Sequence, residues 1–135
     1  EMCIRDRYVG MGRTAEGLKK GIAELKEIRK EFETNLFIPG SKEGMNVELD
    51  KAIRLYDFIT MGELVAYDAL NRNESCGGHF REEYQTEEGE AKRDDENFFY
   101  VACWEYQGDD EKAPVLYKEP LVYEAIKVQT RNYKS

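Results

Sequence analysis

The residues with the richest potential chemistry lie in one stretch, NRNESCGGHFREEYQ, at positions 71–85. It holds the only histidine of the chain, His79, three residues after Cys76. Such a pair could act as nucleophile and base, but it would need an orienting group and an oxyanion hole, and the spacing identifies neither. Carboxylates that could form an acid–base pair follow, as they do in many solvated loops: Glu82, Glu83, Glu87, Glu88 and Glu90. We therefore predict no catalytic residue in this chain.

The other cysteines do not create a metal site by their spacing. Cys3 and Cys103 form no CxxC pair and lie at no ligand spacing from His79, whereas zinc needs four ligands or three and a water. We expect reduced thiols and no bound metal. The sequence has neither GxGxxG nor GxxxxGK[ST], so we expect no nucleotide cradle within it.

Composition narrows the possible partners. The 135 residues are 41% hydrophobic and 36% charged, as in an ordinary globular domain. The net charge of −8 leaves no basic stripe to neutralise phosphates, so we expect no nucleic-acid partner. No apolar run approaches the roughly 20 residues that span a bilayer.

Two long helices should position the histidine stretch. Thr14 can cap the first, whose apolar residues recur at helical spacing as one narrow stripe. These residues are Leu18, Ile22, Leu25, Ile28 and Phe32. The charged residues between them, Arg29 among them, should face solvent. Asn46 can cap the second helix, predicted from about Val47 to Asn73, whose apolar residues wrap most of the way round and should be covered on more than one side.

The chain after Asn73 predicts a different architecture. Residues 74–97 have no usable period and indicate an irregular acidic segment. Residues 98–106 alternate with apolar residues on both faces, which is typical of a strand buried on two sides. A turn at 108–114 and a return through 115–128, with Pro120 at an edge or at the strand's end, complete a β-hairpin that needs a surface to lie on. The predicted fold class is α+β, mainly α: a helical bundle, an irregular segment and a hairpin.

The first seven residues, EMCIRDR, differ from the rest because they show neither periodicity nor a cap. They are similar to a translated sequencing-adapter peptide, and we expect that residues 1–7 are foreign and that the chain is a piece of a longer protein. We divide the remainder into a helical domain at 8–73 and a docking segment with hairpin and tail at 74–135.

Three ordered motifs carry a family resemblance: ESCGGHFREEY, RDDENF and RNY. They resemble the C-terminal region of the flavoprotein subunit of succinate dehydrogenase and fumarate reductase. Cys76 stands where the family usually has arginine and Gly78 where it has alanine, a departure similar to the quinol:fumarate reductases of anaerobic bacteria. Upstream, YVGMGRTAEGLKKGIAELKEIR and LVAYDALNRNES fit the family's helical region, so the likeness runs from about Tyr8 to Ser135.

The resemblance implies a parent enzyme whose FAD and catalytic residues all lie upstream, so it assigns no catalytic, cofactor-binding or metal-binding residue here. The parent interconverts succinate and fumarate and exchanges electrons with an iron–sulfur subunit and, through a membrane anchor subunit, with quinone. The resemblance also implies that the parent is a peripheral subunit at the cytoplasmic face of the inner membrane. We expect this part to dock on the flavin-binding domain through a charged network: Glu74, His79, Arg81, Arg93, Asp94 and Asp95.

Two alternatives stay open from sequence. L-aspartate oxidase has a related C-terminal helical region with a similar motif, although the longer acidic tail, the hairpin and the final RNY favour the succinate and fumarate enzymes. A free-standing helical module that binds a partner through exposed apolar faces is the other.

Overall fold

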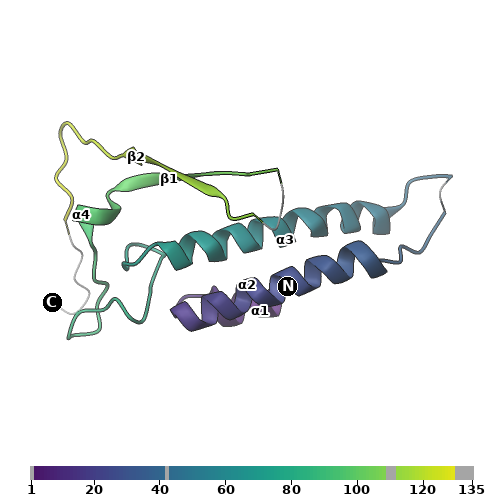
Figure 1. The fold of residues 1–135 in the computed structure, drawn as a ribbon, viewed down its shortest axis with the longest axis horizontal. Coiled ribbons are helices and arrows are strands. Elements are labelled where there is room, and N and C mark those ends of the chain that lie inside the picture. The colour runs from purple at the N-terminus through teal and green to yellow at the C-terminus, as the bar shows by residue number, and fades with distance from the viewer. Residues whose placement is uncertain (1, 42, 109–111, 130–135) are drawn as a thin grey trace.

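A computed structural model describes residues 2–41, 43–108 and 112–129. Two long helices lie side by side, and a two-stranded hairpin runs along the side of the second helix that faces away from the first (Figure 1). This arrangement confirms the predicted fold class. The elements in chain order are α1 (Met2–Tyr8), α2 (Ala15–Asn35), α3 (Val47–Asn71), α4 (Asp95–Phe98), β1 (Tyr100–Glu105) and β2 (Val115–Pro120).

Both predicted caps begin their helices. The Thr14 side chain accepts a hydrogen bond from the Gly17 amide at 3.0 Å. The Asn46 side chain accepts from the Glu48 and Leu49 amides at 3.0 and 3.2 Å. Each side chain satisfies amides that have no partner within the first turn, which fixes where the helix starts.

The buried side of α2 contains one charged residue that sequence reasoning placed in solvent. Leu18 and Leu25 are buried as predicted, but Arg29 is buried with them. Its guanidinium lies 2.7 Å from the Glu63 carboxylate of α3, so the prediction that Arg29 faces solvent was wrong. A charge can be buried when an opposite charge pairs with it, and the partner here comes from a distant part of the sequence.

The core lies where the start of α2 meets the end of α3. Val9, Leu18, Ala66 and Ala69 form its buried cluster, and Tyr8 packs against it. Residues 2–8, whose sequence shows neither periodicity nor a cap over its first seven positions, nonetheless form α1 on the side of α2. A Cβ at Gly21 would lie 3.1 Å from the Tyr8 Cβ, so the glycine permits this close packing.

The hairpin is fixed to α3 through the only tryptophan. The Trp104 ring packs edge-on against Tyr67 at 5.1 Å, and its indole N–H donates to the Asp68 carboxylate at 2.7 Å. Strand β2 ends at Pro120 as predicted. The predicted burial of both faces of β1 is wrong for this chain, since Val101 is 50% exposed on the face away from the helix.

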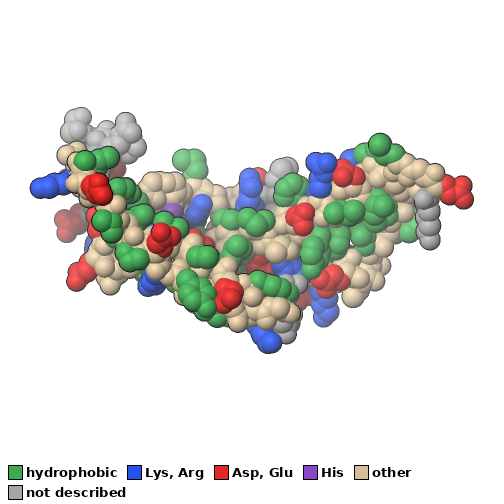
Figure 2. Space-filling view, turned by 90° about the horizontal axis from the view of Figure 1, so that it is seen from above, with side chains coloured by type: hydrophobic (Ala, Val, Ile, Leu, Met, Phe, Trp, Pro, Cys, Tyr) green, Lys and Arg blue, Asp and Glu red, His purple; other side chains and the backbone are tan. Residues whose placement is uncertain are grey.

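Helix α3 is covered by α2 and in part by the hairpin, yet much apolar surface stays exposed on it. The exposed residues are Val47, Leu49, Ile53, Leu55, Phe58, Met61 and Val65. Figure 2 shows hydrophobic side chains gathered toward the end of the molecule that the hairpin does not reach. Among the described residues, no helix is long and apolar enough to cross a membrane.

A polar joint between helix α3 and strand β1

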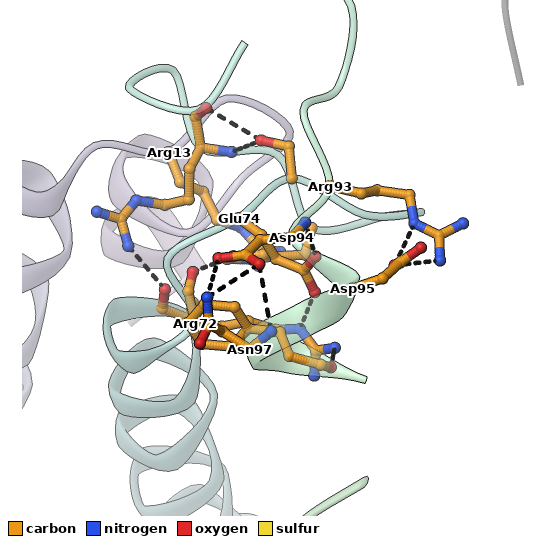
Figure 3. A network of polar contacts seen from close by, with 12 residues as sticks. Arg13, Arg72, Glu74, Arg93, Asp94, Asp95 and Asn97 are labelled. Atoms are coloured by element: carbon orange, nitrogen blue, oxygen red, sulfur yellow. Dashed lines mark hydrogen bonds and ion pairs between the residues drawn. The ribbon is translucent and has the colours of Figure 1, made fainter. Parts of the chain in front are cut away.

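The segment from the end of α3 to β1 is held by side-chain hydrogen bonds rather than by regular structure. Its only helix is the four-residue α4, which the sequence did not predict. Glu74, Ser75 and Arg81 are nonetheless buried, with exposures of 0 to 2%. Figure 3 shows part of the resulting network. We call residues 72–99, together with the side chains that bond them, the polar joint. The expectation of an irregular segment is correct, but this segment is not a freely solvated loop.

Arg81 is the most buried cation of the joint. Its Nη1 donates to the carbonyls of Ala69 and Leu70 at 3.0 and 3.2 Å, near the C-terminus of α3. Its Nε donates to the Glu83 carboxylate at 3.1 Å. The Arg81 amide and carbonyl both bond the Ser75 hydroxyl, at 2.8 and 3.1 Å. A guanidinium at this position also opposes the negative end of the helix dipole.

Glu83 ties the joint to the start of α2. Its carboxylate accepts a hydrogen bond from the Ala15 amide and from Arg81. Burial raises the pKa of Glu83, but these hydrogen bonds and the Arg81 charge outweigh that effect and leave the pKa below its usual value. The side chain is therefore ionised at neutral pH.

His79 sits between two other parts of the chain. Its Nδ1 lies 3.0 Å from the Arg13 Nη1, and its Nε2 lies 2.9 Å from the Arg72 carbonyl. Because a guanidinium can only donate, Nδ1 is the acceptor and Nε2 carries the hydrogen. Burial is the largest cause that lowers the pKa of His79, and the charges of Arg13, Arg81 and Arg72 lower it further against the opposing bond to the Arg72 carbonyl.

Glu74 brings the end of α3 and the start of α4 together. One carboxylate oxygen accepts from the Arg72 Nε at 2.8 Å and the other from the Asp94 amide at 2.9 Å, as Figure 3 shows. Arg72 also donates to the Phe98 carbonyl at 2.8 Å. Asp94 in turn caps α4 by accepting from the Asn97 amide at 3.2 Å. Several donors around a buried carboxylate replace the hydrogen bonds to water that it loses on burial.

The six residues expected to form a docking network therefore fall into groups. The Asp94 amide donates to the Glu74 carboxylate, and Arg93 pairs with Asp95 at 3.0 Å near the surface. Arg81 bonds carbonyls at the end of α3, and His79 bonds the Arg72 carbonyl just past it. All of these bonds lie within the chain. Whether the same residues also contact another domain stays a prediction.

Sequence reasoning missed several members of the joint: Arg13, Arg72 and Ser75. Ser75 lies inside the ESCGGHFREEY motif and Arg72 two residues before it, so their position was a usable signal. Arg13 offered none, because it lies 66 residues before His79. Backbone bonds join the same places, from the Arg13 amide to the Phe80 carbonyl at 3.0 Å and from the Glu82 amide to the Arg13 carbonyl at 2.9 Å.

The described residues offer little to a metal. No three of their His, Cys, Asp or Glu side chains are grouped to hold an ion. The cysteines are free thiols. The joint can hold backbone segments and charged side chains in fixed positions. The chain is therefore a helical domain with a preorganised polar joint.

Comparison with known proteins identifies the family. The family model described as "Fumarate reductase flavoprotein C-term" matches residues 3–133. The chain belongs to this family, the C-terminal region of fumarate reductase and succinate dehydrogenase flavoproteins. The sequence resemblance is thereby confirmed. The match begins before Tyr8 and does not decide whether residues 1–7 are foreign, which stays a prediction.

Individual relatives agree with this family. The fumarate reductase flavoprotein subunit of Proteus vulgaris is 35% identical over 89 residues, which cover 66% of this chain and 14% of that protein. An uncharacterized FAD-dependent oxidoreductase of Methanocaldococcus jannaschii is 32% identical over 77 residues, covering 57% and 13%. The chain thus matches only about one seventh of these relatives' length.

Solved structures share the fold. A mutated quinol fumarate reductase of E. coli superimposes with a TM-score of 0.77 at 25% identity, covering 95% of this chain and 21% of that chain. The Sdh1 complex of Mycobacterium smegmatis gives 0.70 at 24% identity, covering 87% and 19%, which supports the fold alone. The final RNY motif of the sequence resemblance, at residues 131–133, lies outside the described residues.

Proposed function

We propose that this chain is the C-terminal docking domain of the flavoprotein subunit of a fumarate reductase or succinate dehydrogenase. The family match across residues 3–133 carries this proposal. In the parent, FAD would be bound by the upstream flavin-binding domain and would exchange a hydride with succinate or fumarate. Electrons would pass between the flavin, an iron–sulfur subunit and quinone at a membrane anchor.

The role of this chain in that parent is structural. It supplies no group to the flavin or the substrate, and it would be inactive alone. As part of the subunit it would lie at the cytoplasmic face of the membrane without entering it, in contact with the flavin-binding domain and near the iron–sulfur subunit.

The surface of the chain supports a docking role. Helix α3 exposes several large apolar side chains, for example Phe58 and Ile53, each 60% exposed. On the hairpin, Val101 and Tyr117 are 50 and 56% exposed. Apolar residues exposed along a long helix and a hairpin are typical of a surface that another domain covers. The polar joint holds these two elements in a fixed relation, so both could meet one partner.

A chimera tests this function. The C-terminal region of the E. coli fumarate reductase flavoprotein subunit would be replaced by residues 8–135 and co-expressed with its other subunits. We expect the purified complex to retain FAD and to reduce fumarate. A chimera that folds, as judged by circular dichroism, but binds neither FAD nor the iron–sulfur subunit would contradict the proposal.

A point variant in this chimera tests the joint. Arg81→Ala should lower the flavin content or the thermal stability of the complex, because the buried guanidinium holds the docking segment on α3. Arg54→Ala is the matched control, since Arg54 is exposed and pairs with the exposed Asp50 one turn away. Equal flavin content and stability in both variants would remove Arg81 from the docking network.

A further inference from the structure

Three parts of the chain meet at the His79 imidazole. The loop before α2 supplies the Arg13 guanidinium, which donates to Nδ1. The residue after α3 supplies the Arg72 carbonyl, which accepts from Nε2. The joint itself supplies the histidine, held in a tight turn by two backbone bonds with Cys76 at 2.8 and 3.0 Å. The neutral ring therefore uses both nitrogens, one as acceptor and one as donor.

We propose that His79 is a pH-sensitive latch, which holds the loop before α2 against the joint while neutral and releases it when Nδ1 binds a proton from solvent. The proton converts Nδ1 from an acceptor into a donor. Arg13 Nη1 then faces an N–H instead of a lone pair, and two cations lie 3.0 Å apart. The bond to the Arg72 carbonyl needs only Nε2–H and can persist, so the change is directed at Arg13.

The charges around the ring make a proton on His79 unfavourable while Arg13 stays in place, so they favour release of the loop. The groups that act on His79 are Arg13 from the loop, Arg72 from the end of α3 and Arg81 from the joint, and all three are cationic. The nearby carboxylates already have partners: Glu74 binds Arg72, and Glu83 binds Arg81. Asp68 of α3 also acts on Arg13, but it already accepts a hydrogen bond from Trp104. A proton on His79 places a positive charge directly beside the Arg13 guanidinium, and separation of the loop relieves this repulsion.

The latch can be read directly because His79 is the only histidine. With the 135-residue chain prepared without a histidine tag, NMR titration of the imidazole carbon-bound protons reports this one group. We expect a titration midpoint below the ordinary 6.5. A midpoint at or above that value would overturn the proposal, since the folded protein would then accept the proton without cost.

Release of the loop is measured at two amides. The Arg13 amide bonds the Phe80 carbonyl, and the Glu82 amide bonds the Arg13 carbonyl. Hydrogen-exchange protection of both amides should fall below pH 6.5, by at most about tenfold per pH unit because one proton is involved. The Ile59 amide in the middle of α3 is the internal reference and should keep its protection.

Two variants separate the latch from general acid sensitivity. His79→Gln keeps an N–H donor but cannot titrate, so the extra pH dependence at the Arg13 and Glu82 amides should disappear. Arg13→Gln removes one repelling cation and should raise the His79 midpoint. The proposal fails if the His79→Gln variant shows the same pH-dependent loss of protection as the original chain, or if Arg13→Gln leaves the midpoint unchanged.

Discussion

Replacing Arg81 by alanine should cost more stability than any other single change in the polar joint. The side chain is 3% exposed, and its Nη1 donates to the carbonyls of Ala69 and Leu70. A hydrogen bond from a charged group contributes about 1.5–3 kcal/mol. The helix dipole adds about 0.3–1 kcal/mol at a C-terminus. The pair with Glu83, which is 40% exposed, adds at most about 1 kcal/mol.

The sum for Arg81→Ala is a loss of about 2–5 kcal/mol, a large share of the roughly 5–15 kcal/mol of a typical domain. Urea unfolding followed by far-UV circular dichroism measures it. With a slope of about 2 kcal/mol per molar, the midpoint should fall by about 1–2.5 M. If the alanine variant does not fold, Arg81→Lys provides the measurement, because a single ammonium can still donate to one of the two carbonyls and should lose less.

Arg93→Ala is the matched control for this measurement. Arg93 makes an ion pair with Asp95, which is 52% exposed, so its loss should cost no more than about 1 kcal/mol. A loss at Arg81 below about 1 kcal/mol, or equal to the loss at Arg93, would refute the reasoning that burial and the helix end make this arginine important.

Four further predictions use the same unfolding assay or one close to it. Asn46→Ala removes the cap of α3 and should cost about 0.5–2 kcal/mol; an unchanged midpoint would show that the cap is dispensable. Asp68→Ala should shift the emission of the single tryptophan to the red, because its indole N–H loses its partner and the hairpin loosens; unchanged emission would contradict this contact. Gly77→Ala should cost about 1–2 kcal/mol, since Gly77 has φ of +57°, whereas Gly78→Ala, with open space around it, should be nearly neutral. Because burial lowers the pKa of His79, the unfolded chain binds the proton first and stability should fall as the pH drops below 6.5, a dependence that His79→Gln should remove.

The parts of the fold that sequence predicted are those set by local chemistry. Thr14 and Asn46 start their helices because each side chain reaches amides only two or three residues away. Pro120 ends β2 because it lacks an amide hydrogen. The α3 boundary was two residues too long, at Asn73 instead of Asn71, because helical periodicity does not show which residue supplies the last cap.

The parts that sequence did not predict depend on distant partners. Arg29 is buried because Glu63, on another helix, lies opposite. The role of Arg13 depends on His79, 66 residues later. Helix α1 is seven residues long, and it packs beside α2 through Tyr8 and Gly21. A short helix is stabilised by tertiary packing more than by its own propensity, so its sequence carries little signal.

The motif ESCGGHFREEY can be understood as a cap that is supplied from outside the helix. An α-helix leaves its last four carbonyls without partners, and many helices satisfy them with a glycine directly after the end. Helix α3 has no such glycine. Instead the Arg72 amide bonds the Asp68 carbonyl, and Arg81 bonds those of Ala69 and Leu70.

The chain must fold back for Arg81 to reach that helix end. The turn formed by Cys76 and His79, with Gly77 in the left-handed region, makes this reversal, and His79 then binds the Arg72 carbonyl just past the helix. Glycine, histidine and arginine at these spacings thus end a long helix in a defined direction. Because the hairpin begins from the same joint, the cap also fixes where β1 lies on α3. The motif therefore has a physical reason for its residues in this chain: it sets the direction in which the segment leaves α3.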